Sequence, residues 1–171
     1  MGSYITDTPH VGALPERRLS ERRAAWAAAD ARPRGMAVPS WTQPAALAAL
    51  RVMSALMLMQ HGVQKLLGEF GGYRGTPGAT AELMSRSGVA GVLELVGGFL
   101  LAIGLFTRPV AFVLSGLMAF AYFLVHAPNG FWPIMNRGEL PALYCFVFLL
   151  ISAAGPGAAS VDGLLQRRRR R

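Results

Sequence analysis

The sequence predicts an all-α fold, an integral membrane antiparallel four-helix bundle with a polar, largely disordered N-terminal tail. Of its 171 residues, 53% are hydrophobic and only 15% are charged, whereas a soluble domain carries roughly 25% charged residues. The apolar residues occur in long blocks, and most basic residues lie outside them, toward the two ends of the chain. The length is sufficient for one domain. Together these properties favour a small protein of the bilayer.

Four apolar segments are the predicted spans, at residues 44–67, 88–106, 109–127 and 139–154. A spanning helix needs about 20 residues, with a range of about 17 to 25. The first three segments meet this requirement. The fourth is short, so it either continues through residue 159 or sits in locally thinned lipid.

Turn-forming residues separate these segments. The connections are "GEFGGYRGTPG" (68–78), "TRP" (107–109) and "PNGFWPIMNRG" (128–138), and "GPGAAS" (155–160) follows the last span. Pro109 suits the first turn of a helix. Short connections imply that consecutive helices are antiparallel neighbours.

The chain is therefore divided into a polar basic N-terminal tail at residues 1–39, a four-span membrane domain at 40–163 and a basic C-terminal tail at 164–171. We expect the N-terminal tail to be largely disordered. Its stretch "ERRLSERRAAWAAADARPRG" (16–35) has an alternative interpretation as a weak basic amphipathic helix on a lipid surface.

The distribution of positive charge predicts the orientation. With four spans both termini share one side, and that side carries twelve basic residues, from the N-terminal tail, Arg108 and 167–171, against four on the other side. Because cytoplasmic loops carry the excess of Lys and Arg, both termini are expected in the cytoplasm, with the protein multi-pass in the bacterial cytoplasmic membrane. This placement explains the net charge of +8 better than nucleic-acid binding does. The terminal arginines would also attract anionic lipid.

Several polar residues lie within the spans, where ionisable groups are costly and usually face a bundle interior or a cavity. His61 and Lys65 are one helical turn apart and share a face. Glu94 is the natural counter-charge for Lys65, since either charge would be expensive alone in hydrocarbon. From depth along the spans we expect one polar pocket in the outer half of the bundle, formed by His61, Gln64, Lys65, Glu94, His126 and Glu139.

Two interpretations of this pocket remain open. It is either a set of ion pairs that fixes helix register, or a site for a quinone-like headgroup, a proton relay or another small molecule. A weaker alternative makes His61 and His126 the axial ligands of a haem. No catalytic residue can be assigned. No metal site is expected, because zinc spacing is absent and Cys145 is the single cysteine.

A second polar group lies toward the inner side and consists of Arg51, Arg108 and Asp162. Arg51 is inside the first span. Its side chain is expected either to snorkel toward the cytoplasmic lipid phosphates or to pair with a group at the inner end, such as Asp162.

Five motifs, in order along residues 44–163, resemble the DoxX family of four-span membrane proteins: "RVMSALMLMQHGVQKLLG", "ELVGGFLLAIGLFTRP", "VHAPNGFW", "GELPALY" and "GPGAASVD". The resemblance implies a link to respiratory or redox chemistry, since relatives include a membrane subunit of thiosulfate:quinone oxidoreductase and membrane anchors of oxidative-stress assemblies. By motif position, the candidates for the family's polar residues are Arg51, His61, Lys65, Glu94, His126 and Glu139.

The sequence and the resemblance together predict a quinone-interacting or redox-complex-associated membrane subunit. We expect no cofactor of its own, so a quinone, a redox-enzyme subunit or both would have to supply the redox chemistry. The alternative is a non-catalytic membrane scaffold that recruits soluble redox enzymes. A small-solute carrier is a third possibility, although no inverted repeat is visible. The expected partners are the lipid bilayer and redox-enzyme subunits, with a homo-oligomer left open and no nucleic acid.

Overall fold

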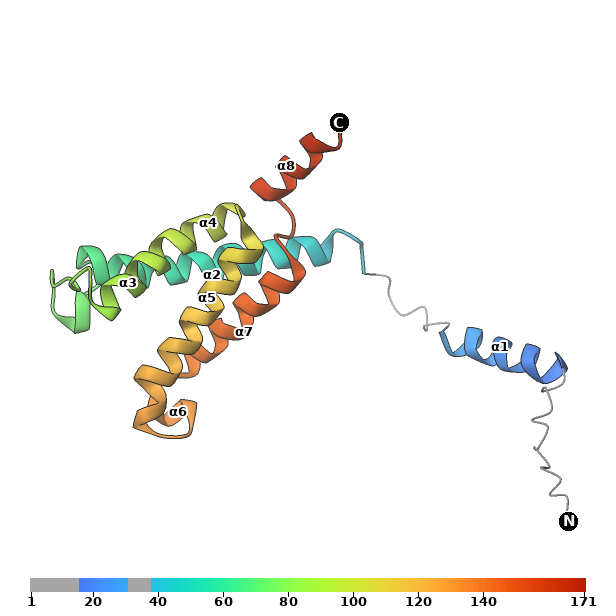
Figure 1. The fold of residues 1–171 in the computed structure, drawn as a ribbon, viewed down its shortest axis with the longest axis horizontal. Coiled ribbons are helices and arrows are strands. Elements are labelled where there is room, and N and C mark those ends of the chain that lie inside the picture. The colour runs from blue at the N-terminus through green and yellow to red at the C-terminus, as the bar shows by residue number, and fades with distance from the viewer. Residues whose placement is uncertain (1–15, 31–37) are drawn as a thin grey trace, which may run out of the picture. The chain divides into compact units, whose positions relative to one another are not determined.

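A computed structural model of the chain describes residues 16–30 and 38–171, and its regular structure there is entirely helical (Figure 1). The chain divides into two units, residues 1–38 and 39–171. The elements are α1 (Glu16–Asp30), α2 (Thr42–Leu67), η1 (Tyr73–Gly75), α3 (Arg86–Val92), η2 (Leu93–Gly97), α4 (Gly98–Ile103), α5 (Thr107–Ala121), η3 (Tyr122–His126), η4 (Ala127–Asn129), α6 (Pro133–Asn136), α7 (Glu139–Ala154) and α8 (Val161–Arg169).

The first unit contains α1, a helix in the part of the tail for which the sequence allowed a weak basic helix. Its charged and apolar residues are spread around the helix and do not form opposite faces, which is unlike a helix that lies on lipid. Arg17 and Glu21, one turn apart, form an exposed ion pair of 3.6 Å. The rest of the tail that we expect to be disordered, residues 1–15 and 31–37, lies outside the described residues.

The second unit contains the spans. Three continuous helices are long and apolar enough to cross a membrane: Thr42–Leu67, Arg86–Ile103 and Thr107–Asn129. The second of these is built from α3, η2 and α4, and the third from α5, η3 and η4. The fourth apolar helix, α7, has 16 residues and is about 24 Å long at 1.5 Å per residue. The prediction of an all-α membrane bundle is confirmed.

The fourth span ends at Ala154 and does not continue to residue 159. Gly155 follows it with φ of 100° and ψ of −166°, a conformation that no helix residue adopts. The chain then turns back, and the amide of Ala158 donates a hydrogen bond to the Pro44 carbonyl near the start of α2. The start of α2 and the start of α8 therefore lie at the same end of the bundle, which we call the α8 end.

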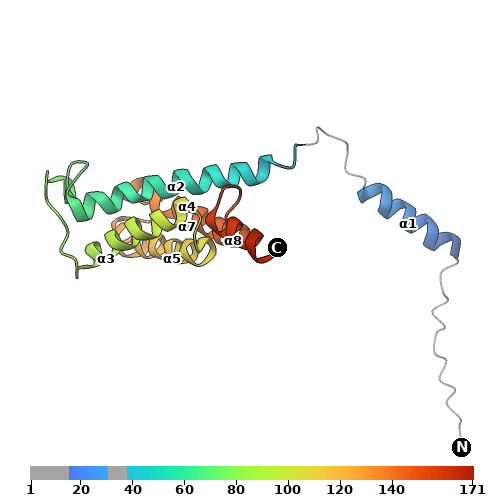
Figure 2. The same ribbon diagram turned by 90° about the horizontal axis from the view of Figure 1, so that it is seen from above.

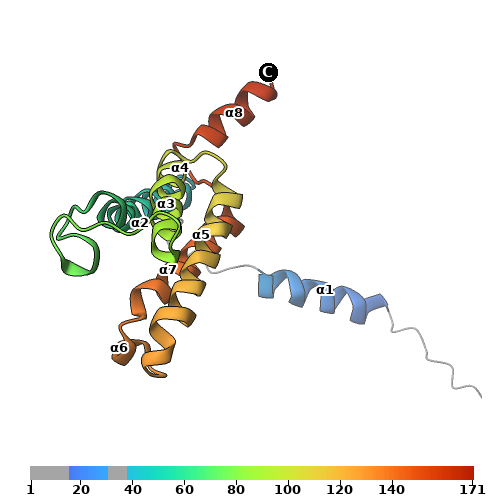
Figure 3. The same ribbon diagram turned by 60° about the vertical axis from the view of Figure 1, so that its left-hand side comes forward.

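The spans pack as two pairs. The second span runs along α2, and α5 packs along α7. The pairs meet where η2 and α4 contact α5 and where α2 contacts α7. All four spans run in a similar direction in Figure 2, but Figures 1 and 3 show that the two pairs cross and diverge away from the α8 end. We call the opposite end, with residues 68–85 and 127–138, the far end.

A narrow apolar core lies between the pairs. The first, third and fourth spans each contribute residues three or four positions apart, as expected for helices that bury one face, and the second span contributes Leu101. The buried residues of the core are Ala55, Leu58, Leu101, Ala111, Leu114, Met118, Tyr144, Phe148 and Ile151. Large apolar side chains such as Phe112, Phe120 and Phe146 point outward and are exposed. In a bilayer these outer side chains contact lipid.

Gly62 sets the closest approach between α2 and the second span. A Cβ atom added at Gly62 would lie 2.7 Å from the Leu95 nitrogen and 2.8 Å from the Gly91 oxygen. Both are backbone atoms, so no side-chain movement could make room. Small residues allow this kind of backbone contact between membrane helices. The contact brings Lys65, about one turn further along α2, against the helix that carries Glu94.

Candidate functional site

Lys65 and Glu94 form a largely buried ion pair near the far end of α2. Lys65 Nζ donates a hydrogen bond to Glu94 Oε1 at 2.5 Å. The lysine side chain is 24% exposed and the glutamate side chain is 5% exposed. Glu94 Oε2 is buried and has no hydrogen-bond partner in the part of the chain that the structure describes. Half of this carboxylate is therefore available to a further hydrogen-bond donor.

Glu94 belongs to η2, a π-helical turn inside the second span. A π-helical turn inserts one extra residue into a helix and is frequent at functional sites. The sequence of this turn, "LELVG", contains no proline. The π-helical turn therefore has no sequence signal by which it could have been predicted. The turn alters the register of the span where the buried carboxylate faces the neighbouring helix.

A loop closes over the lysine from the far end. Gly68, with φ of 73°, ends α2 in the left-handed conformation that glycine adopts readily. The chain then returns, and the Ala81 amide donates to the Lys65 carbonyl at 2.7 Å. The Gln64 side-chain amide donates to the Phe70 carbonyl at 3.1 Å. Gln64 thus holds the loop and is not a free group of the pocket.

His61 completes the group. It lies one turn before Lys65 on α2 and is half-buried. We call His61, Lys65 and Glu94 the polar triplet. An ammonium has three donors and an ionised carboxylate only acceptors. The polar triplet can therefore donate to one oxygen of a ligand and accept from another.

His126 and Glu139, the other two ionisable residues of the predicted six-residue pocket, make their observed contacts outside the polar triplet, and the six-residue pocket stays a prediction. His126 Nδ1 is 3.0 Å from the Asn136 carbonyl oxygen, across the loop between α5 and α7. Glu139 is exposed in the first turn of α7, where its negative charge interacts favourably with the positive end of the helix dipole. Among the described residues no hydrogen bond or ion pair links either of them to Lys65 or Glu94. The prediction assumed parallel spans, whereas the two pairs diverge at this end.

The Asn136 side chain stabilises the loop at the far end of the second pair. The sequence interpretation did not identify this residue. Its side chain is buried, with Oδ1 accepting from the Gly138 amide at 2.8 Å and Nδ2 donating to the Gly130 carbonyl at 2.7 Å. Asn is common in turns because its side chain can imitate a backbone turn. That preference, within a segment already recognised as a connection, is the signal that could have identified it.

Arg51, at the α8 end, is completely buried, with 0% exposure. Its Nη1 donates to the Leu101 and Ala102 carbonyls, both at 2.6 Å, and its Nε donates to the Pro156 carbonyl at 2.8 Å. Nη2 completes the set with the carbonyls of Ala158 and Ala159, at 3.5 and 3.0 Å. The guanidinium does not snorkel to lipid phosphate, so that expectation was wrong. It meets groups at the inner end of the bundle, as the alternative expected, but these are backbone carbonyls and not the Asp162 carboxylate. It binds backbone carbonyls at the end of α4 and in the segment that follows α7.

Asp162 caps another helix end. Its two carboxylate oxygens accept from the amides of Phe106 and Thr107, at 3.0 and 2.8 Å, and its own amide donates to the Gly104 carbonyl at 2.9 Å. Burial acts to raise the pKa of the Asp162 carboxyl, but the hydrogen bonds from Thr107 and Phe106 together with the charge of Arg51 outweigh it, and the pKa lies below its usual value. The carboxylate is therefore negative at the N-terminus of α5, where a negative charge is favoured.

Arg108 binds the C-terminal end of α7, whereas Asp162 binds the N-terminal end of α5. Its Nη1 donates to the Ser152 and Ala153 carbonyls, at 3.0 and 2.6 Å. All three residues of the predicted inner-side group thus bind helix ends, and each charge opposes the partial charge of the helix it meets. This group is structural in its contacts.

Tyr144 is a buried polar residue that the sequence interpretation overlooked. Its ring stacks on Phe148 with centroids 5.4 Å apart, and its Oη has no hydrogen-bond partner in the described part of the chain. An aromatic residue within an apolar run has the same pattern as a core residue, so the sequence carried no signal. By residue count Glu94 and Tyr144 lie about 14 and about 15 Å from the α8 ends of their helices, at a similar depth.

The described residues contain no group of three or more His, Cys, Asp or Glu side chains that could hold a metal ion. Within residues 16–30 and 38–171 the buried side-chain atoms that lack a hydrogen-bond partner are Thr107 Oγ1, Tyr144 Oη and Glu94 Oε2, and only the last of these belongs to the polar triplet. Its chemistry is that of hydrogen bonding and proton exchange.

Comparison with known proteins identifies the family. The DoxX family model matches residues 46–127. An uncharacterized protein of Haemophilus influenzae is 45% identical over 123 residues, which cover 70% of this chain and 90% of that protein. The chain belongs to the DoxX family. An uncharacterized membrane protein of Mycobacterium tuberculosis is 31% identical over 158 residues, covering 78% of this chain and 93% of that protein. No solved structure matches this DoxX protein.

The ion pair of this DoxX protein can be tested by a double-mutant cycle. Glu94→Leu leaves a buried ammonium without a partner, so we expect a loss of about 3–5 kcal/mol in the free energy of unfolding. Adding Lys65→Met should recover much of that loss, because replacing both members of a buried pair by apolar groups is often nearly neutral. Unfolding in detergent micelles measures both effects. A Glu94→Leu protein as stable as wild type would contradict the pairing.

Proposed function

We propose that this DoxX-family protein is a quinone-interacting or redox-complex-associated membrane subunit whose ligand headgroup contacts the polar triplet. The observation that carries the proposal is the Glu94 carboxylate, in which Lys65 engages one buried oxygen and no described residue engages the other. A buried polar atom without a partner is costly. A ligand with a hydroxyl or amine donor would remove that cost.

A bound quinone would supply reversible redox chemistry, and the protein residues would bind it and exchange protons. Lys65 can donate to a ligand oxygen through donors that Glu94 does not use. Glu94 Oε2 can accept from a hydroxyl group. His61, half-buried at the edge of the triplet, can pass protons because its imidazole ring has two nitrogens, one of which can accept a proton while the other donates one. Electrons would come from a partner redox subunit.

Binding is tested by the thermal stability of the purified full-length protein with a short-chain benzoquinone or naphthoquinone added in its reduced quinol form, because only the quinol has hydroxyl donors for Glu94 Oε2. A ligand that binds only the folded state raises Tm. We expect a rise for wild type and a weakening of binding by about tenfold or more for Glu94→Gln, which keeps the side-chain size but loses the negative acceptor. Each variant is compared with its own Tm without quinone.

Glu139→Gln is the matched control, because it makes the same charge change at an exposed position outside the polar triplet. It should bind quinone as wild type does. The proposal fails if neither quinone class raises the Tm of wild type, or if Glu94→Gln responds as strongly as Glu139→Gln.

We further propose that the α8 end faces the cytoplasm of a bacterium, with the protein in its cytoplasmic membrane. The support is the excess of basic residues in the two tails and at Arg108, interpreted by the positive-inside rule. A reporter that is active only in the cytoplasm should then be active when it is fused after Arg171. Activity of an exported reporter, such as a periplasmic phosphatase, at that position would contradict this orientation.

A further inference from the structure

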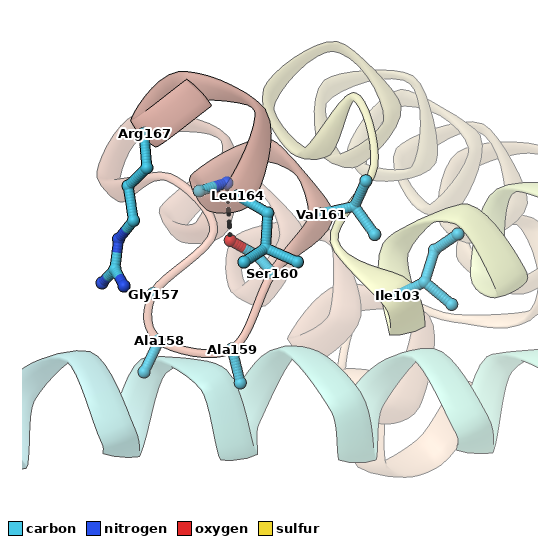
Figure 4. Close-up of a pocket in the computed structure, with 9 residues that line it drawn as sticks. Ile103, Gly157, Ala158, Ala159, Ser160, Val161, Leu164 and Arg167 are labelled. Atoms are coloured by element: carbon cyan, nitrogen blue, oxygen red, sulfur yellow. Dashed lines mark hydrogen bonds between the residues drawn. The ribbon is translucent and has the colours of Figure 1, made fainter. Parts of the chain in front are cut away.

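Two adjoining hollows flank α8. The first, of ≈ 370 Å³, lies between Ile103, the 157–159 loop and the first turns of α8, with Arg167 at its edge. Figure 4 shows the Arg167 side chain extending along this loop, while Val161 and Leu164 lie between Arg167 and Ile103. The second, of ≈ 470 Å³, is lined by Val161, Leu164, Leu165, Arg167, Arg168 and Arg171. Both combine apolar walls with guanidinium groups.

The hollows are built on a fixed part of the fold. Ser160 caps α8 by accepting from the Gly163 amide at 3.1 Å. Asp162 attaches the first turn of α8 to the turn between α4 and α5 through three hydrogen bonds. Arg51 holds the loop 155–160 that forms one wall. The arginines of α8 are therefore presented at a defined place, beside the ends of the spans.

The arginines at residues 167–171 are exposed, and no ion pair within the described residues involves any of them. Leu164 and Leu165 on the same helix are also exposed, at 61% and 46%. A guanidinium binds phosphate in a bidentate geometry, and basic clusters directly beside a membrane helix attract anionic lipid. The surface therefore complements a molecule with a phosphate at one end and a hydrocarbon chain at the other.

We propose that α8 and its two hollows form a binding site for an anionic glycerophospholipid of the adjacent leaflet. Arg167 and Arg168 bind its phosphate, and Val161, Leu164 and Ile103 contact the upper part of an acyl chain. The bilayer is the source of this ligand because only six residues separate α7 from α8, at the boundary of the spans. This site is separate from the polar triplet and does not depend on the proposed function.

The test compares short-chain phosphatidylglycerol with phosphatidylcholine of the same chain length, added to the full-length protein in detergent. Native mass spectrometry counts bound lipid, and Tm reports stabilisation. We expect phosphatidylglycerol to bind and to raise Tm, and phosphatidylcholine to do neither. The double variant Arg167→Gln with Arg168→Gln should bind phosphatidylglycerol about tenfold or more weakly.

The matched control is Arg169→Gln with Arg170→Gln, which removes the same charge from neighbouring positions outside the lining of either hollow. It should change the affinity by less than about threefold. Equal losses in the two double variants would overturn the site, because they would indicate a delocalised attraction to the whole arginine run.

The acyl-chain contact has its own test. Leu164→Asn should weaken phosphatidylglycerol binding while leaving Tm without lipid nearly unchanged, since Leu164 is exposed. Competition by glycerol 3-phosphate at the same concentration as the lipid would overturn this part, because it would identify a site for free phosphate. Tighter binding of a poly-glutamate peptide than of phosphatidylglycerol would reassign the surface to an acidic protein.

Discussion

The architecture depends on one buried guanidinium at the α8 end. Arg51, on α2, donates to carbonyls at the end of α4 and in the segment that follows α7. The Leu101 carbonyl also accepts from the Gly104 amide, but the Pro156 and Ala159 carbonyls lie outside any helix and would be unsatisfied in a dry interior without the guanidinium. One side chain therefore joins three parts of the chain that are distant in sequence. Gly104, which lies against it, has no room for a side chain, because an added Cβ would be 2.9 Å from Arg51 Nη1.

The contacts of Arg51 explain why the two ends of the bundle differ. At the α8 end Arg51, Asp162 and Arg108 bind backbone groups from neighbouring segments. At the far end each pair of spans is closed by its own loop, one through Gln64 and the other through Asn136. The pairs are thus free to diverge there, and the polar triplet belongs to the first pair alone. Its buried carboxylate is held in place by backbone contact at Gly62 and not by a ring of four helices.

Much of the fold could be predicted because hydropathy and turn chemistry are local signals. Residue type and spacing predict the spans and their connections. They also predict that Lys65 and Glu94 form an ion pair, because each is an isolated charge within a span. The role of Arg51 could not be predicted, because its partners are backbone carbonyls, which have no sequence signature. Depth along a span placed His126 beside Lys65 only on the assumption of parallel helices. The crossing of the two pairs depends on side-chain packing, which a single sequence does not reveal.

The most direct test of this account is the stability of Arg51→Lys against Arg108→Lys. Lysine keeps the charge but gathers its donors on one nitrogen, so it cannot reach both α4 and the 155–160 segment. We predict that Arg51→Lys lowers the free energy of unfolding in mixed micelles by about 2–4 kcal/mol. Arg108→Lys, an exposed contact to a helix end, should lower it by about 1 kcal/mol or less. Equal effects of the two substitutions would contradict the central place of Arg51.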